Sequence, residues 1–199
     1  MSFIPTFELG FWNGWIFILP FFLLPFIGSY LIKKRKMESL SEYLSEFSIK
    51  LKIIMIMLVI PIYGSYFYSI FLPIELGTFW FFIGLVIFLV GLSIQIVAWH
   101  NLATTPVDTV VTKGLYRNSR NPMYIGDFLV LVSIAIICLS WIFLLVSILS
   151  FILNYIAVIS EERECLAKYG DSYKNYTDRI PRWIGKAKTE NSWYFETNY

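Results

Sequence analysis

Residues 125–159 read IGDFLVLVSIAIICLSWIFLLVSILSFILNYIAVI, an apolar run in which Asp127 is the one formally charged residue. At about 1.5 Å per residue, a single helix of this length would extend for about 50 Å. The hydrocarbon core of a bilayer is only about 30 Å thick. The run therefore forms either one long helix that projects beyond the bilayer or a helical hairpin that turns near Ser140-Trp141. Neither glycine nor proline marks such a turn, so the residues of the run leave both structures open.

The composition of the whole chain is that of an integral membrane protein. Of its 199 residues, 57% are hydrophobic and 15% are charged, and the mean hydropathy is +0.65. A soluble domain carries about 25% charged residues. The net charge of +2 does not indicate a nucleic-acid partner. Cys138 and Cys165 lie in unlike surroundings, and their spacing indicates neither a disulfide framework nor a metal site.

Three further apolar segments have the length of about 20 residues that a membrane helix needs. They cover about 11–32, 53–72 and 78–99. The first is followed by Lys33-Lys34-Arg35-Lys36, an order typical of a retained anchor rather than a cleaved signal peptide. In the third, Gly84 and Gly91 lie on one helical face, which favours close helix packing.

The distribution of basic residues predicts the orientation of the chain. Lysines and arginines gather in 33–52 and 100–124, whereas the loop 73–77 carries only Glu75. Because positive residues mark the cytoplasmic side, we expect the N-terminus outside and both basic segments inside. From Glu161 onward the sequence becomes polar, which predicts a cytosolic helix from Glu161 to a C-cap at Gly170 and a second polar stretch over 171–178.

Two segments are more polar than their neighbourhood requires. Residues 111–126 read VTKGLYRNSRNPMYIG, where Gly114 and Pro122 punctuate a turn-rich backbone whose amides can hold a polar ligand at the membrane surface. Glu161 and Glu162 follow the long apolar run. Adjacent carboxylates suit a diol, an ammonium group or a pair of arginines, although acids also commonly begin a helix.

Both polar segments resemble motifs of one family. Gly114-Leu-Tyr116, followed by Arg120-Asn-Pro-Met-Tyr-Ile-Gly126, resembles the signature of the isoprenylcysteine carboxyl methyltransferase and phospholipid methyltransferase superfamily. The stretch from Glu161-Glu162 to Ile180-Pro-Arg182 resembles the C-terminal block of the same superfamily. The resemblance covers about residues 104–184. Two positions depart from it: many eukaryotic members have histidine in place of Asn121, and an arginine in place of Ala157.

The resemblance implies a fold and a cofactor. Since both motifs must meet around one cofactor, it favours the hairpin, and hence an all-α, polytopic membrane bundle of about five transmembrane helices with the last two short and paired. The length of the chain suggests one domain over residues 1–199. Within it, the resemblance implies that 100–126 and 157–184 bind S-adenosylmethionine on the cytosolic side. The implied cofactor contacts are Val111, Tyr116, Asn121, Pro122, Met123, Tyr124 and Glu161.

Glu162 and Arg120 are the candidate catalytic residues. The acceptor is expected to be a lipid or another lipophilic molecule that enters from the bilayer. If it is an ammonium group it must lose a proton, which calls for a base such as Glu162 or Asp127. If it arrives ionised, Arg117 or Arg120 could hold it. Ala157 removes one cation and the acid pair adds negative charge, which favours a neutral or amine acceptor over a prenyl-cysteine carboxylate.

Several alternatives stay open at this point. His100, at the end of the third apolar segment, either contacts cofactor or substrate or forms interfacial hydrogen bonds. Tyr124-Ile-Gly-Asp127 differs by one methylene from a motif of membrane sterol reductases, which use NADPH. A non-catalytic scaffold or a transporter would have charged residues inside its spans, but Asp127 alone qualifies, at a span edge. A membrane methyltransferase is favoured over both.

Overall fold

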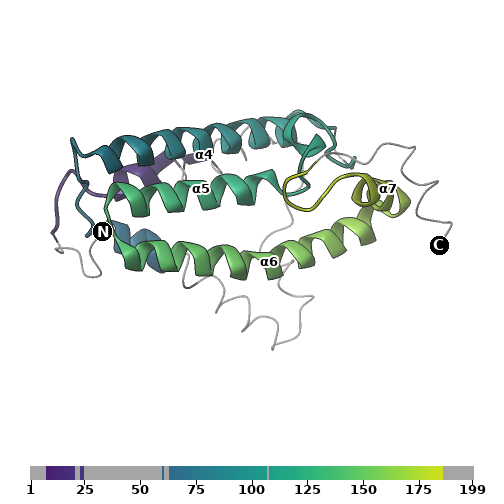
Figure 1. Ribbon diagram of the computed structural model, residues 1–199. Helices are drawn as coiled ribbons and strands as arrows, with labels where there is room; N and C mark the ends of the chain where they lie inside the picture. Colours follow the sequence, from purple (N-terminus) through teal and green to yellow (C-terminus); the bar gives the residue numbers. More distant parts are fainter. Residues whose placement is uncertain (1–7, 21–22, 25–59, 61–62, 107, 186–199) are drawn as a thin grey trace, which may run out of the picture.

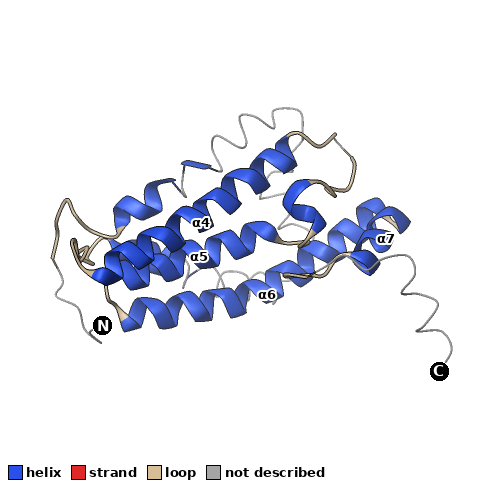
Figure 2. Ribbon diagram, turned by 45° about the horizontal axis from the view of Figure 1, so that its top comes forward, coloured by secondary structure: helices blue, strands red, loops and turns tan. Residues whose placement is uncertain are grey.

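Three long helices lie side by side and carry the shorter elements at their ends (Figure 1, Figure 2). The computed structural model describes residues 8–20, 23–24, 60, 63–106 and 108–185. In chain order its elements are α4 (Phe79–Ala103), the 3-10 helix η1 (Gly114–Arg117), α5 (Pro122–Ile137), α6 (Trp141–Tyr169) and α7 (Asp171–Arg179). Shorter helical stretches cover 15–20 and 63–69. The described residues form no strand beyond an isolated bridge between Asn13 and Pro73, which confirms the all-α class for this part of the chain.

Helices α4 and α6 are each long and apolar enough to cross a membrane. Their apolar side chains are mostly on the outside, because only 28% of the most apolar stretch of α4 and 22% of that of α6 are buried. A continuous apolar surface of this extent is unfavourable in water and favourable in lipid. The two helices therefore support the association of the chain with a membrane.

Glycines allow α4 and α5 to pack closely. A Cβ added at Gly84 would lie 2.5 Å from a side-chain carbon of Ile137, at the end of α5. Gly91 and Gly126 face each other in the same way, since a Cβ on either would lie 3.0 Å from the carbonyl oxygen of the other. The packing role predicted for Gly84 and Gly91 is confirmed.

The chain turns between α5 and α6 at residues 138–140. Leu139 adopts a positive φ of 49° there. The Ser140 hydroxyl then caps α6 by accepting a hydrogen bond of 3.2 Å from the Phe143 amide. The apolar run 125–159 is therefore divided between two antiparallel helices, as the hairpin interpretation expects, and is not one continuous helix.

The expectation that both hairpin helices are short is wrong for α6. This helix continues through Glu161 to Tyr169, so the polar helix predicted to begin at Glu161 is the last part of α6. Residues 161–169 read EERECLAKY, which contains good helix formers and neither glycine nor proline, so nothing stops the helix there. It ends at the predicted C-cap, Gly170, whose φ is +54°. The second polar stretch forms α7.

Two of the predicted spans, 11–32 and 53–72, lie partly outside the described residues. The structure describes 11–20 and 23–24 of the first span and 60 and 63–72 of the second, and the longest helical stretches among these residues are 15–20 and 63–69. The number of five transmembrane helices and the orientation of the chain therefore stay predictions.

The apolar core and the polar motifs lie at opposite ends of the bundle. The Glu75 amide, just before α4, donates to the carbonyl of Ile137, the last residue of α5, at 3.2 Å. The buried core includes Phe17, Ile18, Leu72, Phe88, Val130, Leu131, Ile134, Ala135, Ile137, Cys138 and Phe143. At the other end, α4 ends and α5 begins, η1 lies against the end of α4, and α7 lies beside the late part of α6 (Figure 1). This end brings the two polar segments together.

Candidate functional site

The first polar segment passes closely over the end of α4. Gly114 begins η1 with a φ of +58°, a backbone conformation that favours glycine. It lies directly on the buried side chain of Asn101, so that an added Cβ would be 2.2 Å from Asn101 Nδ2. Both the conformation and the close approach therefore require glycine at this position. The turn delivers Tyr116 and Asn121 to the start of α5.

The two polar segments enclose a pocket of about 250 Å³. Its wall comes from the end of α4, the loop that follows, η1, the start of α5, the end of α6, and α7. The lining residues are Leu102, Thr109, Val110, Val111, Tyr116, Arg120, Asn121, Met123, Tyr124, Glu161, Glu162, Cys165, Tyr169, Tyr173 and Tyr176. Its volume is slightly below the range of about 300–1,000 Å³ of small-molecule sites, whereas its apolar walls with a few convergent polar groups are typical of such sites.

Most of the site residues predicted from the sequence line this pocket. They are Val111, Tyr116, Asn121, Met123, Tyr124 and Glu161 of the cofactor set, and Arg120 and Glu162 of the catalytic set. Pro122 does not line it, since it is buried as the first residue of α5, where its fixed φ suits a helix start. His100 and Asp127 are not lining residues either. His100 is exposed, and its carbonyl accepts a hydrogen bond of 2.7 Å from the Thr104 hydroxyl.

Tyr124 and Glu161 connect the two segments across the hairpin. The Tyr124 hydroxyl, in the first turn of α5, donates a hydrogen bond of 2.6 Å to Glu161 Oε1, late in α6. Hydrogen bonds to a charged group contribute about 1.5–3 kcal/mol. An ionised carboxylate has about four acceptor sites, so Glu161 can also accept donors from a ligand in the pocket.

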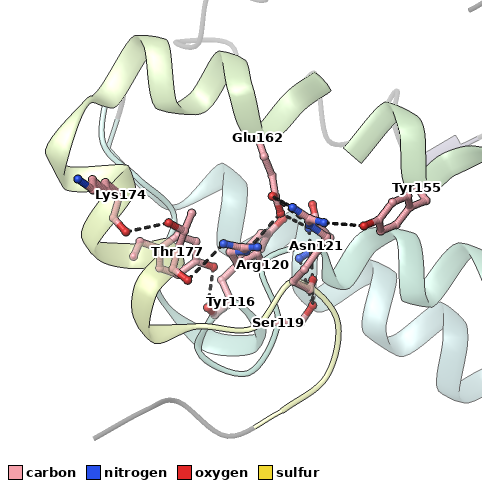
Figure 3. Close-up of polar contacts among 10 residues, drawn as sticks. Tyr116, Ser119, Arg120, Asn121, Tyr155, Glu162, Lys174 and Thr177 are labelled. Carbon is pink, nitrogen blue, oxygen red and sulfur yellow. Dashed lines mark hydrogen bonds and ion pairs between the residues drawn. The ribbon is translucent and has the colours of Figure 1, made fainter. Parts of the chain in front are cut away.

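Glu162 is the centre of the polar network (Figure 3). Its Oε1 accepts from Asn121 Nδ2 at 3.0 Å and lies 3.2 Å from Arg120 Nε. Its Oε2 accepts from Arg182 Nε at 3.0 Å and from Arg182 Nη2 at 2.8 Å. Both carboxylate oxygens are therefore bound by cationic or amide donors, and the side chain is only 11% exposed.

Helix α7 fixes the first polar segment from the other side. The Tyr176 hydroxyl donates to the Tyr116 carbonyl at 2.8 Å, and Arg120 Nη1 donates to the Thr177 carbonyl at 3.3 Å. Burial raises the pKa of Tyr173 and of Tyr176 above the ordinary value of a phenol. Both phenols therefore stay protonated at neutral pH, as the contact of Tyr176 with a carbonyl oxygen requires.

The sequence-based site set omits several residues that the pocket includes. They are Leu102, Thr109, Val110, Cys165, Tyr169, Tyr173 and Tyr176. The three tyrosines were visible in the C-terminal block, where aromatic residues recur in an otherwise polar segment. Arg182 was also part of that block. The sequence-based site set does not include Arg182, although its guanidinium binds Glu162.

The family relationship rests on the part of the chain that builds this site. A family profile described as phospholipid methyltransferase matches residues 74–172, which span α4, η1, α5, α6 and the start of α7. No curated protein matched the chain in a direct sequence comparison. The resemblance inferred from the two motifs is confirmed, and the family match does not favour a reductase, a scaffold or a transporter. The chain belongs to the phospholipid methyltransferase family, a family of membrane methyltransferases.

Proposed function

We propose that the protein transfers a methyl group from S-adenosylmethionine to a lipid acceptor with an amine headgroup. The observation that carries this proposal is the pocket in which both motifs meet, with Glu161 and Tyr124 on its wall. Among the described residues that line it, Arg120 is the one cation, and it pairs with Glu162. Burial raises the pKa of Glu161 above the ordinary value of a carboxyl, and the hydrogen bond from Tyr124 acts in the opposite direction. In its ionised form, which a bound cation favours, Glu161 supplies negative charge that no arginine of the pocket wall neutralises.

The residues of the pocket fit S-adenosylmethionine. Its sulfonium and ammonium groups are cations, and its ribose carries a diol, which together suit the carboxylate of Glu161. Its adenine base suits the tyrosines and the apolar wall formed by residues such as Leu102, Val111 and Met123. When bound, it supplies a methyl group activated by attachment to a positive sulfur.

We assign different roles to the two adjacent acids. Glu161 would hold the positive part of the donor, with Tyr124 fixing its orientation. Glu162 accepts hydrogen bonds from Asn121 and Arg182 and forms an ion pair with Arg120, so we assign it to holding the pocket wall in place rather than to removing a proton. Catalysis would come mainly from orientation of the acceptor and exclusion of water, since displacement at a methyl group needs an aligned nucleophile.

The same charges favour an amine acceptor over an anionic one. A carboxylate or phosphate at the reacting position would be repelled by Glu161, and Arg120 is already paired with Glu162. An amine would be attracted as its ammonium form and would react as its neutral form. The rate should therefore follow deprotonation of the amine, without a requirement for Glu162 as base.

The orientation of the protein is part of the proposal. The chain would cross the membrane several times, with its N-terminus outside and its C-terminus and pocket on the cytoplasmic side. The basic residues at 100–124 support this side for the pocket. An acceptor lipid would approach laterally from the bilayer.

Transfer of labelled methyl groups into a total lipid extract tests the function directly. The purified protein in detergent or nanodiscs is incubated with methyl-labelled S-adenosylmethionine and the extract, and the labelled species are identified by mass spectrometry. Label in an amine-headgroup lipid supports the proposal. Label in a carboxyl ester or a thioether contradicts the amine assignment, and no labelled product contradicts methyl transfer to a lipid.

A further inference from the structure

We infer that Arg182 is a positioning residue of the methyl-donor site, which it holds together through Glu162. This inference rests on the proposed function. Arg182 does not line the pocket itself, but its two contacts with Glu162 reach a carboxylate that does. It lies in the segment 180–185, which we call the C-terminal strap.

The side chain of Arg182 is fixed at three of its donors. Nε and Nη2 both bind Glu162 Oε2, at 3.0 and 2.8 Å, and Nη1 donates to the Tyr155 hydroxyl at 3.0 Å. The guanidinium also lies 5.4 Å from the centre of the Tyr155 ring. The hydrogen bond to Glu162 raises the pKa of Arg182 above its ordinary value, so the positive charge is permanent.

The backbone of the strap holds the loop before α5. The Pro181 carbonyl accepts from the Arg120 amide at 3.0 Å, and the Gly185 amide donates to the Asn118 carbonyl at 3.2 Å. The Arg182 carbonyl accepts from the Asn121 side chain at 3.3 Å. Residue 182 thus binds Asn121 through its carbonyl and Glu162 through its guanidinium, while Asn121 and Glu162 bind each other.

Aromatic packing holds the strap against α6. The ring of Trp183 lies 5.0 Å from that of Phe151 and 6.2 Å from that of Tyr155, centre to centre. Phe151 in turn contacts Phe128 of α5 at 4.5 Å. The strap is therefore attached to both hairpin helices, so that Arg182 approaches Glu162 from a fixed direction.

These contacts give Arg182 a specific effect on the pocket wall. Glu162 and Asn121 line the pocket, and each is bound by residue 182, which does not line it. Without the guanidinium, Glu162 keeps its contacts with Arg120 and Asn121 on Oε1 but loses both donors on Oε2. Its side chain then gains freedom to move. The donor site would then be less well formed before binding, which weakens binding more than it slows transfer.

Variants of Arg182, compared with a matched control, test this inference. Arg182→Gln should raise the Kd and the KM for S-adenosylmethionine about tenfold and change kcat less than about threefold. Arg182→Lys, which keeps the charge, should recover part of the affinity. Arg163→Gln is the control, since Arg163 lies exposed on α6 next to Glu162, and it should bind like the parent. In a Glu162→Gln background, Arg182→Gln should add less than about a twofold effect.

A second readout needs no donor. Cys165 lines the pocket and is partly exposed, whereas Cys138 is buried in the core. Maleimide labelling of Cys165, followed by mass spectrometry of the peptide, should be several times faster in Arg182→Gln than in Arg163→Gln at equal thermal stability. Unchanged labelling and donor affinity in Arg182→Gln, or effects of Arg182→Gln and Glu162→Gln that multiply, would overturn the inference. Faster labelling in a protein whose parent does not bind S-adenosylmethionine would instead reject the proposed function alone.

Discussion

Asn121 and Glu162 are 41 positions apart in the chain, yet the side-chain amide of Asn121 donates a hydrogen bond of 3.0 Å to the Glu162 carboxylate. One residue precedes α5 and the other lies late in α6, so the contact depends on the turn between those helices. It brings the two polar motifs into one wall of one pocket. The hairpin is therefore the feature of the fold that makes the site.

Removal of the charge of Glu161 should weaken binding of the methyl donor. Glu161→Gln keeps the shape of the side chain but loses the attraction for a cation, so we expect a rise in the Kd for S-adenosylmethionine of about tenfold, or roughly 1.4 kcal/mol. Tyr124→Phe removes the hydroxyl that orients Glu161 and should have a smaller effect in the same direction. Titration calorimetry measures both.

Glu164→Gln is the control for this prediction. Glu164 lies exposed on α6, one turn after Glu161, and is not a lining residue of the pocket. The same loss of charge there should leave the affinity close to that of the parent. Equal weakening by Glu161→Gln and Glu164→Gln would mean that the effect is one of overall charge, and the role of Glu161 would be rejected.

Gly114→Ala should destabilise the protein and disturb the pocket. A side chain at a positive φ costs about 1–3 kcal/mol, and here the new Cβ would also overlap Asn101. Gly77→Ala is the matched control, because Gly77 also has a positive φ but no neighbour within 4 Å of an added Cβ. Thermal denaturation should show a larger loss for Gly114→Ala, and Asn101→Ala should recover part of it. Equal losses at Gly77 and Gly114 would contradict the close contact with Asn101.

The close packing of α4 against α5 predicts an effect of substitutions on stability alone. Gly84→Ala places a methyl group 2.5 Å from the Ile137 side chain, and such overpacking typically costs about 1–3 kcal/mol. Gly64→Ala, in a helical stretch with open space around the Cβ position, should be neutral or stabilising, since alanine favours a helix over glycine by about 1 kcal/mol. A melting temperature of Gly84→Ala equal to or above that of Gly64→Ala would contradict the packing.

The sequence predicted those features that depend on local pattern. Apolar run length indicated the membrane helices, and the spacing of Gly84 and Gly91 indicated a packing face. Gly170 indicated the end of α6. The two motifs predicted most of the pocket wall, because in each motif the site residues lie close together in the sequence.

Other features depend on tertiary contacts that a sequence pattern does not contain. The continuation of α6 past Glu161 was missed because a change from apolar to polar residues marks the end of the membrane, not the end of the helix. The pairing of Glu162 with Arg182 was missed because it needs the strap to fold back on α6. The ion pair between Arg120 and Glu162 is a contact of the same kind, and the catalytic roles of these two residues stay predictions.

The pH dependence of transfer tests the chemical class of the acceptor. Only the neutral amine is nucleophilic, and an alkylammonium group titrates near pH 10. The rate at saturating donor should therefore rise with pH from about 6 to 9, by up to about tenfold per unit while most of the amine is protonated. A flat profile over this range would indicate an acceptor that is already ionised, such as a carboxylate with a pKa near 4.

Labelling of single cysteines tests the orientation of the chain. Glu75 lies beside Ile137 at the turn end of the hairpin, whereas Lys174 lies in α7 at the pocket end. In a Cys165→Ser background, Glu75→Cys should react with an impermeant maleimide from outside, and Lys174→Cys only after the membrane is permeabilised. Labelling of both positions from the same side would contradict a pocket that is separated from Glu75 by the bilayer.

Calorimetry of the purified protein in nanodiscs, with S-adenosylmethionine and with NADPH as separate titrants, tests the central claim most directly. We predict saturable binding of S-adenosylmethionine that is weakened in Glu161→Gln and unchanged in Glu164→Gln, and no binding of NADPH. Binding of NADPH without binding of S-adenosylmethionine, or equal binding of S-adenosylmethionine by the parent and Glu161→Gln, would contradict the assignment of this pocket to a methyl donor.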